Sequence, residues 1–276
     1  MIGSLRVEHF FDQKILITGA SSGIGKLMAE TFAAEGARVI LWDCNRVTLE
    51  AVEKELNERG LRCATYLCDV SSRDSVHDTA KRVIHEHGPI DILINNAGVV
   101  SGRPLLEISD AEIERTFGVN ALAPIWTTRA FLPAMIERGR GHIVTIASAA
   151  GLIGTPQMTD YAASKHAAVG FDDALRSELR HLGHRGIRTT VVCAYFISTG
   201  MFEGAGAATP LFPILTPDYA TRQIVRAIRR GRRRLLLPRA VALVYLGRLL
   251  PAPIFDWIVR ALGVTRSMDD FTGRRE

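Results

Sequence analysis

The sequence predicts an α/β protein: one doubly wound domain around a seven-stranded parallel sheet, followed by a helical extension at the C-terminus. Short apolar runs typical of strands alternate along the chain with longer amphipathic segments typical of helices. The strand segments are apolar throughout, which is typical of a parallel sheet covered by helices on both faces. The 276 residues are 47 % hydrophobic and 23 % charged, the composition of a globular protein.

Seven segments are predicted to form strands, with helices between them. The strand segments are KILIT (14–18), ARVILW (37–42), LRCATYLC (61–68), DILIN (91–95), HIVTIA (142–147), RTTVVC (188–193) and RLLLP (234–238). The helical segments are the stretch that ends at Gly36, and 45–60, 73–87, 110–138, 159–182 and 218–230. Ser109 with Glu112 reads as a capping box, and Thr216 with Pro217 supplies a cap and a first-turn proline.

The chain divides at the end of the last predicted strand. Residues 1–238 are expected to form the domain, and residues 239–276 an apolar and basic extension with two short helices, 240–250 and 254–262. The long connection 198–216 is expected to act as a functional lid, because structureless loops of this length are uncommon in compact domains. No apolar run reaches the roughly 18 uncharged residues that a membrane-spanning helix needs.

The C-terminal part of the chain is strongly basic. The whole chain has a formal charge of +5, but residues 221–276 contain 13 Arg and 4 acidic residues, which leaves +9 there and −4 elsewhere. Five of these arginines form a cluster just before the apolar extension: Arg229, Arg230, Arg232, Arg233 and Arg234. Three roles are open for the extension: contact with a membrane surface, closure of a substrate pocket, and packing on a second subunit. Nucleic acid is not expected as a partner, because no aromatic residues interleave the arginines.

The cysteines and the N-terminal residues indicate the compartment. Cys44, Cys63, Cys68 and Cys193 form neither a C-x-x-C pair nor a zinc pattern, so neither a metal nor a disulfide is expected. The residues before the first strand are partly charged and leave no room for the apolar core of a signal peptide. A cytoplasmic location is predicted, with peripheral membrane association as an open alternative.

A glycine-rich turn directly follows the first strand and opens a helix. It contains Gly19, Ser21, Ser22, Gly23, Ile24 and Gly25. Glycines permit a tight turn and close approach to the backbone, and the N-terminus of a helix binds a pyrophosphate. This turn therefore predicts a dinucleotide site at the first crossover of a Rossmann domain, with a purely structural turn as the alternative.

Asp43 ends the second strand, where an acidic side chain would accept both ribose hydroxyls of an adenosine and repel a 2′-phosphate. NAD is therefore favoured over NADP as the cofactor. Two alternatives are open: Asp43 caps the next helix, or Arg46 nearby serves a phosphate.

Further polar motifs follow the later strands. They are Asp69-Val70, Asn96-Ala97-Gly98, Asn120, Ser148, and Tyr161 with Lys165 four residues on. Together with the glycine-rich turn, this set resembles the short-chain dehydrogenase/reductase family over residues 14–238. The resemblance implies an oxidoreductase that acts on CH–OH groups with a nicotinamide cofactor. It also implies a homodimer or homotetramer formed through the helices 110–138 and 159–182.

The spacing of Tyr161 and Lys165 supports a catalytic role on physical grounds. Residues four apart on a helix share a face, with Cβ atoms roughly 5–6 Å apart. The pKa of a tyrosine has to fall from ~10 to about 7–8 before it acts as a base near neutral pH. A nearby ammonium supplies approximately that effect at an effective dielectric of ~20. Lys165 is therefore expected to lower the pKa of Tyr161 and to hold the nicotinamide ribose, while Ser148 hydrogen-bonds the substrate oxygen.

The resemblance implies roles for the remaining positions. Asn120 would hold a water for proton relay, and Thr199 with the backbone of Ile197 would bind the nicotinamide carboxamide. Ala194 and Tyr195 stand where the family usually has Pro and Gly, so the shape of this turn is open. Tyr195 is a candidate for the substrate pocket.

Three further segments are similar to the subgroup that contains the retinol dehydrogenases and the 17-beta-hydroxysteroid dehydrogenases. They are 41–43, 197–202, and 267–271 with Gly273 and Arg274. The resemblance implies a lipophilic alcohol or ketone as the substrate. An uncharged pocket is expected from Leu152, Met158, Tyr195, Met201 and Phe202, with Ile153, Leu211 and Phe212 beside them. Packing in the core is the alternative for several of these residues.

The sequence therefore predicts an NAD-dependent oxidoreductase that interconverts a lipophilic alcohol, such as a hydroxysteroid or retinoid, and its carbonyl, with Tyr161 as acid/base. Two other functions are open. One is an NADP-linked carbonyl or 3-oxoacyl reductase, and the other is a non-catalytic, nucleotide-sensing scaffold at a lipid surface. The altered turn at Ala194 and Tyr195 and the C-terminal extension keep the second alternative open.

Overall fold

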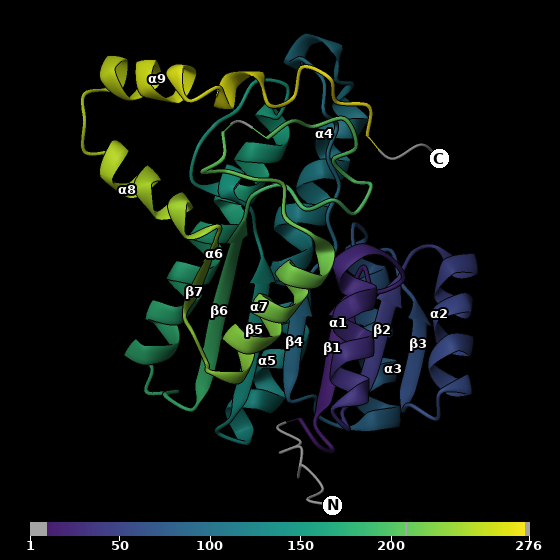
Figure 1. Cartoon of the computed structure of the whole chain (residues 1–276). Helices are drawn as coiled ribbons and strands as arrows, with labels where there is room; N and C mark the ends of the chain where they lie inside the picture. Colours follow the sequence, from purple (N-terminus) through teal and green to yellow (C-terminus); the bar gives the residue numbers. More distant parts are fainter. Residues whose placement is uncertain (1–9, 208, 274–276) are drawn as a thin grey trace, which may run out of the picture.

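The computed structural model describes residues 10–207 and 209–273, which form a seven-stranded parallel sheet with helices on both faces (Figure 1). The strands are β1 (Lys14–Thr18), β2 (Arg38–Asp43), β3 (Cys63–Leu67), β4 (Ile92–Asn95), β5 (Gly141–Ile146), β6 (Ile187–Ala194) and β7 (Arg234–Leu237). Each lies within one or two residues of its predicted segment. Every neighbouring pair is parallel, in the order β3-β2-β1-β4-β5-β6-β7, so the predicted fold class is confirmed.

The helices follow the predicted segments. They are α1 (Gly23–Ala34), α2 (Arg46–Glu58), α3 (Arg73–His87), α4 (Asp110–Phe117), α5 (Ala123–Glu137), α6 (Thr159–His181), α7 (Pro217–Arg229), α8 (Leu243–Gly247) and α9 (Ala252–Ala261). The capping box of Ser109 and Glu112 starts α4, and the Thr216 hydroxyl accepts a hydrogen bond from the Tyr219 N–H at the start of α7, as predicted.

The predicted helix over 110–138 consists of three segments rather than one. A π-helical turn over Gly118–Leu122 separates α4 from α5. Such turns insert one residue into a helix and often occur at functional sites. The turn contains the buried Asn120, so the irregular segment is the part of this helix that reaches the site.

The two faces of the sheet bury separate apolar clusters because side chains alternate along each strand. Ile15 and Ile17 of β1 pack with α1, α2 and α7 on one face. Leu16 packs with α3, α5 and α6 on the other face. Since β2 and β3 continue on one side of β1 and β4 lies on the other, the strand order reverses beside β1. Ligands of open α/β sheets bind at the carboxyl ends of the strands at such a point.

The C-terminal extension leaves the sheet at the end of β7 and lies over the carboxyl edge of the sheet (Figure 1). Val241 and Val244 pack into a cluster with Ala147 and Val191, so the extension shares a core with the domain. The described part of the connection 198–216, which excludes residue 208, contains no helix, and its Leu215 pairs through a single bridge with Ile197 just before the connection. Residues 1–9, which cover most of the segment before β1, and Arg274 of the subgroup motif lie outside the described residues. Within residues 10–207 and 209–273, no helix is long and apolar enough to span a membrane.

Candidate active site

The glycine-rich turn brings the ends of β1 and β4 together. Gly19 has a φ of 62°, and a Cβ there would lie 2.8 Å from the Cα of Ala97. A Cβ on Gly25 would lie 2.1 Å from the carbonyl oxygen of Gly19. Glycine is required at these two positions because the neighbouring backbone leaves no space for a side chain.

Asn96 and Thr18 lock this turn in place. The Asn96 Nδ2 donates to the carbonyl oxygens of Thr18 and Gly19 at 2.9 and 3.0 Å. The Thr18 hydroxyl in turn accepts hydrogen bonds from the N–H groups of Asn96 and Ala97. The predicted Asn96 is thus a positioning residue as well as a lining residue. Thr18 was not predicted, because a threonine at the end of a strand has no distinctive pattern.

Asp43 lies at the carboxyl end of β2 and faces the same cleft. Its carboxylate accepts hydrogen bonds from the N–H groups of Ser21 and Asn45, both at 3.0 Å, so it also fixes the glycine-rich turn. Arg46, the open alternative as a phosphate ligand, is exposed, pairs with Glu50 at 3.7 Å and does not line the cleft. Asp43 therefore contributes a negative charge to this part of the cleft, which Asp69, Glu112 and Arg115 also line.

A single cavity of about 1500 Å³ runs from Asp43 to the catalytic residues and beyond. All the predicted cofactor residues line it: Gly19, Ser21, Ser22, Gly23, Ile24, Gly25, Asp43, Asp69, Val70, Asn96, Ala97, Gly98, Tyr161, Lys165, Ile197 and Thr199. The glycines leave room beside the backbone at the helix N-terminus, and an acidic group stands at one end. These residues fit a dinucleotide.

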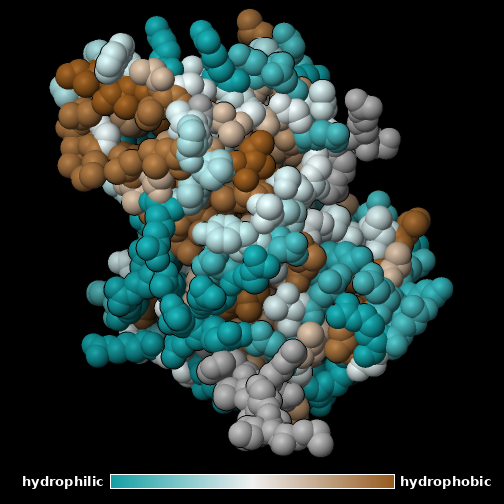
Figure 2. All heavy atoms as spheres, viewed as in Figure 1, coloured by the Kyte–Doolittle hydropathy of each residue, from teal (hydrophilic) through white to brown (hydrophobic). Residues whose placement is uncertain are grey.

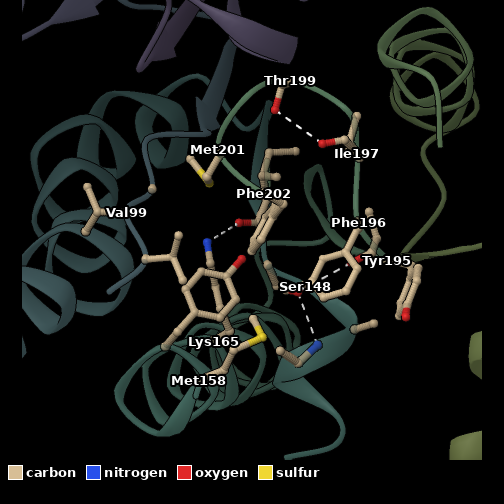
Figure 3. A pocket seen from close by; sticks show the side chains of 18 of the residues that line it. Val99, Ser148, Met158, Lys165, Tyr195, Phe196, Ile197, Thr199, Met201 and Phe202 are labelled. Carbon is tan, nitrogen blue, oxygen red and sulfur yellow. Dashed lines mark hydrogen bonds between the residues drawn. The ribbon is translucent and has the colours of Figure 1, made fainter. Parts of the chain in front are cut away.

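Ser148, Tyr161 and Lys165 all line this cavity. Figure 3 shows Ser148 and Lys165 pointing into it from different parts of the chain. Ser148 follows β5, and Tyr161 and Lys165 lie in the first turns of α6. All three are buried. The Lys165 Nζ donates to the carbonyl oxygen of Ile146 at 2.9 Å and lies 5.7 Å from the centre of the Tyr161 ring. The three predicted side chains are thus brought together, with the ammonium hydrogen-bonded to the backbone at the end of β5.

The pKa of Tyr161 differs from the prediction. Burial raises the pKa of Tyr161 to about 12, and a hydrogen bond with Ser148 partly offsets this rise. Burial also lowers the pKa of Lys165 to about 8. The expectation that Lys165 lowers the pKa of Tyr161 is not met, because both groups lose water and the loss of hydration dominates.

Asn120 does not line the cavity. Its side chain hydrogen-bonds the backbone of Val99 and the hydroxyl of Ser164. Gly98 lies between Asn120 and Lys165, since a Cβ there would be 3.4 Å from the Asn120 Oδ1 and 3.5 Å from the Lys165 Nζ. Asn120 is therefore placed one layer behind the cavity wall, and a relay water at this position stays a prediction.

Four of the five residues predicted for a substrate pocket line the cavity, and one does not. Met158, Tyr195, Met201 and Phe202 line the cavity, and the ring of Phe202 meets the ring of Tyr161 edge-on at 5.8 Å. Leu152 does not line the cavity. It is buried among residues that include Ala168 and Val169 of α6 and Val241, because the short helical turn after Ser148 directs it away.

The second group of pocket residues is also divided. Ile153 and Phe212 line the cavity as expected, whereas Leu211 is exposed and does not. The turn after β6 begins with Ala194 and Tyr195 at the positions of the usual Pro and Gly. The Tyr195 N–H donates to the Leu237 carbonyl at 2.7 Å and extends the pairing of β6 with β7.

Residues of the C-terminal extension complete the cavity. They come from α8, α9 and the segment that follows: Leu243, Leu246, Leu250, Phe255, Ile258 and Phe271. The sequence had left pocket closure by the extension open, and the only signal for it was that both helices are apolar almost all round. The structure agrees with that alternative in so far as residues of the extension line the cavity, and it leaves the other two roles as predictions.

Comparison with known proteins agrees with this geometry. Residues 13–209 match the short chain dehydrogenase family. Epidermal retinol dehydrogenase 2 of Mus musculus is 43 % identical over 265 residues, which cover 95 % of this chain and 86 % of the relative. Retinol dehydrogenase 10-B of Danio rerio is 41 % identical over 288 residues, which cover 96 % and 86 %.

Solved structures give the same fold. A short-chain dehydrogenase/reductase from Burkholderia phymatum in complex with NAD superposes with a TM-score of 0.79 at 29 % identity, covering 87 % of this chain and 94 % of that one. A metagenomic short-chain oxidoreductase in complex with NADP gives a TM-score of 0.68 at 33 % identity, covering 80 % and 91 %.

A dinucleotide cleft at the switch point of a parallel sheet, next to a buried tyrosine and lysine, defines an oxidoreductase of the nicotinamide-dependent class. The chain belongs to the short-chain dehydrogenase/reductase family, whose members act on CH–OH groups, and it groups there with retinol dehydrogenases.

Proposed function

We propose that this protein is an NAD-dependent oxidoreductase that interconverts a lipophilic alcohol, of the retinoid or hydroxysteroid class, and its carbonyl, with Tyr161 as acid/base. One observation carries the proposal. The buried Ser148, Tyr161 and Lys165 lie in one continuous cavity between the predicted dinucleotide residues and an apolar chamber. A bound nicotinamide would supply or accept the hydride.

The chain's own residues hold the proton and orient the substrate. The Ser148 hydroxyl, whose oxygen accepts a hydrogen bond from the Ala150 N–H at 3.1 Å, is placed to hydrogen-bond the substrate oxygen. The Tyr161 hydroxyl takes the alcohol proton in one direction and returns it in the other. Because burial holds its pKa at about 12, the phenol is the acid in the reductive direction, and oxidation needs added positive charge nearby. Lys165 is the nearest source of that charge, once its ammonium turns from Ile146 toward the site.

Asp43 supports NAD as the cofactor. Its carboxylate lines the cavity beside Ser21, where a 2′-phosphate would meet a negative charge. Related proteins of known structure hold NAD in one case and NADP in another, so the cofactor is the first quantity to measure. An NADP-linked carbonyl or 3-oxoacyl reductase is the second candidate function. Its support in this region is Arg115, which lines the cavity and whose charge acts on Cys44, the residue after Asp43, whereas Arg46 is exposed and pairs with Glu50.

The chamber supports a lipophilic substrate. Met158, Met201, Phe202 and Phe271 surround Tyr161, and none of the side chains from the extension that line the cavity carries a charge. The names of the relatives point to a retinoid. A non-catalytic scaffold is less well supported, because the catalytic residues and the cofactor residues share one cavity.

Location and assembly complete the proposal. The four cysteines are unpaired, which supports a reducing, cytoplasmic location. Peripheral contact with a membrane is proposed separately, for the C-terminal extension. The exposed Leu122 and Ile125 near the start of α5 support a homodimer or homotetramer formed through α5 and α6.

The test is nicotinamide absorbance with purified protein against retinol, estradiol, a long-chain secondary alcohol and a 3-hydroxyacyl thioester, each with NAD and with NADP. We expect turnover of retinol or estradiol, with kcat/KM for NAD at least about tenfold above that for NADP, or ~1.4 kcal/mol. Preference for the thioester with NADP would establish the reductase instead. Binding of NADH without turnover of any substrate would favour the scaffold.

A further inference from the structure

Helix α9 has no buried residue, although most of its residues are apolar. Ile254 and Trp257 of α9 are exposed, as are Leu246 of α8 and Leu249 just after it. Figure 2 shows a hydrophobic area around a hollow, in the part of the molecule where Figure 1 places α8 and α9. An exposed apolar area of this kind marks an interaction surface.

The inner sides of the same two helices line the catalytic cavity. Leu246, Leu250, Phe255 and Ile258 all contact the cavity that holds Tyr161. The helices touch where Gly247 lacks a side chain, since a Cβ there would be 2.6 Å from the Phe255 ring. The exposed apolar area and the interior of the cavity are thus two sides of one opening between α8 and α9.

The charge around this opening is positive and unpaired. Residues 239–266 contain Arg239, Arg248, Arg260 and Arg266 but only one acidic residue, Asp256. None of these four arginines forms an ion pair with another residue of the part of the chain that the structure describes, although the Arg248 guanidinium donates to the Leu152 carbonyl and contacts His166. In the upstream cluster, Arg229 pairs with Glu35 and Arg234 with Asp173, whereas the three arginines between them form no ion pair among the described residues. An anionic partner therefore meets unpaired arginines both on the extension and just before it.

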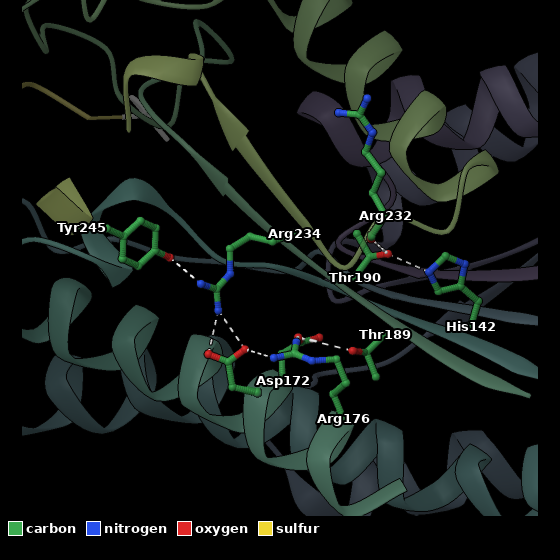
Figure 4. Close-up of polar contacts among 9 residues, drawn as sticks. His142, Asp172, Arg176, Thr189, Thr190, Arg232, Arg234 and Tyr245 are labelled. Atoms are coloured by element: carbon green, nitrogen blue, oxygen red, sulfur yellow. Dashed lines mark hydrogen bonds and ion pairs between the residues drawn. The ribbon is translucent and has the colours of Figure 1, made fainter. Parts of the chain in front are cut away.

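Arg234 holds α8 in this orientation. Its guanidinium donates to the Tyr245 hydroxyl at 2.6 Å and to the Asp173 carboxylate of α6 at 2.7 Å (Figure 4). Arg176 pairs with Asp172 and Asp173 on the same helix. This network fastens α8 to the helix that carries Tyr161, so Leu246 and Leu249 are presented outward on a rigid support.

We propose that α8 and α9 dock on an anionic lipid surface, and that the opening between them admits the lipophilic substrate from the lipid directly into the catalytic cavity. Apolar side chains with arginines around them are the pattern of helices that lie in a membrane interface. A second copy of the chain, docked by two-fold symmetry, would bring like-charged arginines together and cover the opening. The docking stands on its own, whereas the entry route rests on the proposed function.

The first experiment measures docking. The variant combines Leu249→Gln with Trp257→Gln, two residues that are 81 % and 68 % exposed and do not line the cavity. The control is Leu182→Gln, an exposed leucine at the far end of α6 from Tyr161. Each protein is floated with phosphatidylcholine vesicles that contain about 30 % phosphatidylserine, and with phosphatidylcholine alone.

We expect the wild type and the control to float with the phosphatidylserine vesicles, and the double variant to lose binding by about tenfold or more. Binding of the wild type should weaken without phosphatidylserine. Failure of the wild type to float, or equal binding by the double variant, would overturn docking. A wild-type dimer that the double variant splits, with no flotation of either, would show that a second copy covers this surface instead.

The second experiment measures entry. Turnover of retinol carried in the vesicles is compared with turnover of a short, water-soluble secondary alcohol. The double variant should lose about tenfold on vesicle-borne retinol and stay within about twofold of the wild type on the soluble alcohol. If the double variant oxidises vesicle-borne retinol and the soluble alcohol as fast as the wild type does, the entry route is overturned. If the wild type oxidises neither alcohol, the proposed function fails, and flotation alone still decides docking.

Discussion

The side-chain amide of Asn120 makes two opposed hydrogen bonds with the backbone of Val99. Its Oδ1 accepts from the Val99 N–H, and its Nδ2 donates to the Val99 carbonyl, both at 2.9 Å. The second hydrogen of Nδ2 goes to the Ser164 hydroxyl at 3.0 Å, on the helix that carries Tyr161. The π-helical turn thereby joins the loop after β4, which lines the cavity, to the catalytic helix.

Replacing Asn120 tests this connection. Asn120→Ala leaves the Val99 groups and the Ser164 hydroxyl without their partner in a buried place, so we expect unfolding to become easier by about 1–3 kcal/mol. Thermal denaturation measures this loss, and kcat should fall because the loop and α6 are no longer held together. Asn57→Ala, at an exposed position on α2, is the control. An unchanged melting temperature for Asn120→Ala would contradict the connection.

Removing the Tyr161 hydroxyl tests the acid/base assignment. Tyr161→Phe keeps the ring that packs against Phe202, so NADH affinity should change by less than about twofold. Turnover should fall by about 10²–10⁴, the usual contribution of a general acid/base. Steady-state rates and NADH fluorescence titration measure the two quantities. Tyr219→Phe, at an exposed position, serves as the control. Near-normal turnover by Tyr161→Phe would show that Tyr161 is not the acid/base.

Neutralising Asp43 tests the cofactor preference. Asp43→Asn keeps a carbonyl oxygen that can accept from the N–H of Ser21 or Asn45 and removes the negative charge. We expect the ratio of kcat/KM for NAD to that for NADP to fall by about tenfold, ~1.4 kcal/mol, mainly through a gain with NADP. Asp69→Asn, at the end of the next strand, is the matched control. If kcat/KM with NADP rises as much in Asp69→Asn as in Asp43→Asn, the total negative charge of the cleft, and not the position of Asp43, sets the cofactor preference.

His142 predicts part of the pH dependence of stability. Burial lowers its pKa to about 4, while an unfolded histidine titrates near 6.5. Between these values the unfolded chain binds more protons, so this stabilisation is complete above about pH 6.5 and is lost as the pH falls toward 4. The full effect is about 3 kcal/mol. The ring contacts the Thr190 hydroxyl at 2.8 Å (Figure 4).

The variant His142→Gln should therefore flatten the fall in stability between pH 6.5 and 4, as measured by urea denaturation at several pH values. Burial raises the pKa of Asp172 to about 6, which acts in the opposite direction over part of this range. For this reason the comparison is between the variant and the wild type at each pH. Parallel curves would show that His142 does not contribute.

The seven strands, most helix ends and the cofactor residues could be predicted because they depend on local signals. Apolar runs, caps and the glycine-rich turn act over a few residues, and a parallel sheet then brings the carboxyl ends of its strands to one edge. The spacing of Tyr161 and Lys165 likewise determined that they share a face of α6. The sequence by itself thus determined the fold and the cleft, and it predicted which side chains meet there, whose catalytic role stays a proposal.

Only the tertiary structure decided their environment. The pKa of Tyr161 was expected to fall, but burial raises it. Residues distant in the chain cover Tyr161 and Lys165 and remove the water that would stabilise their charged forms. The placement of Leu152 in the core, and of α8 and α9 over the cavity, depended on which apolar surfaces meet, and hydrophobic contact carries no directional signal in the sequence.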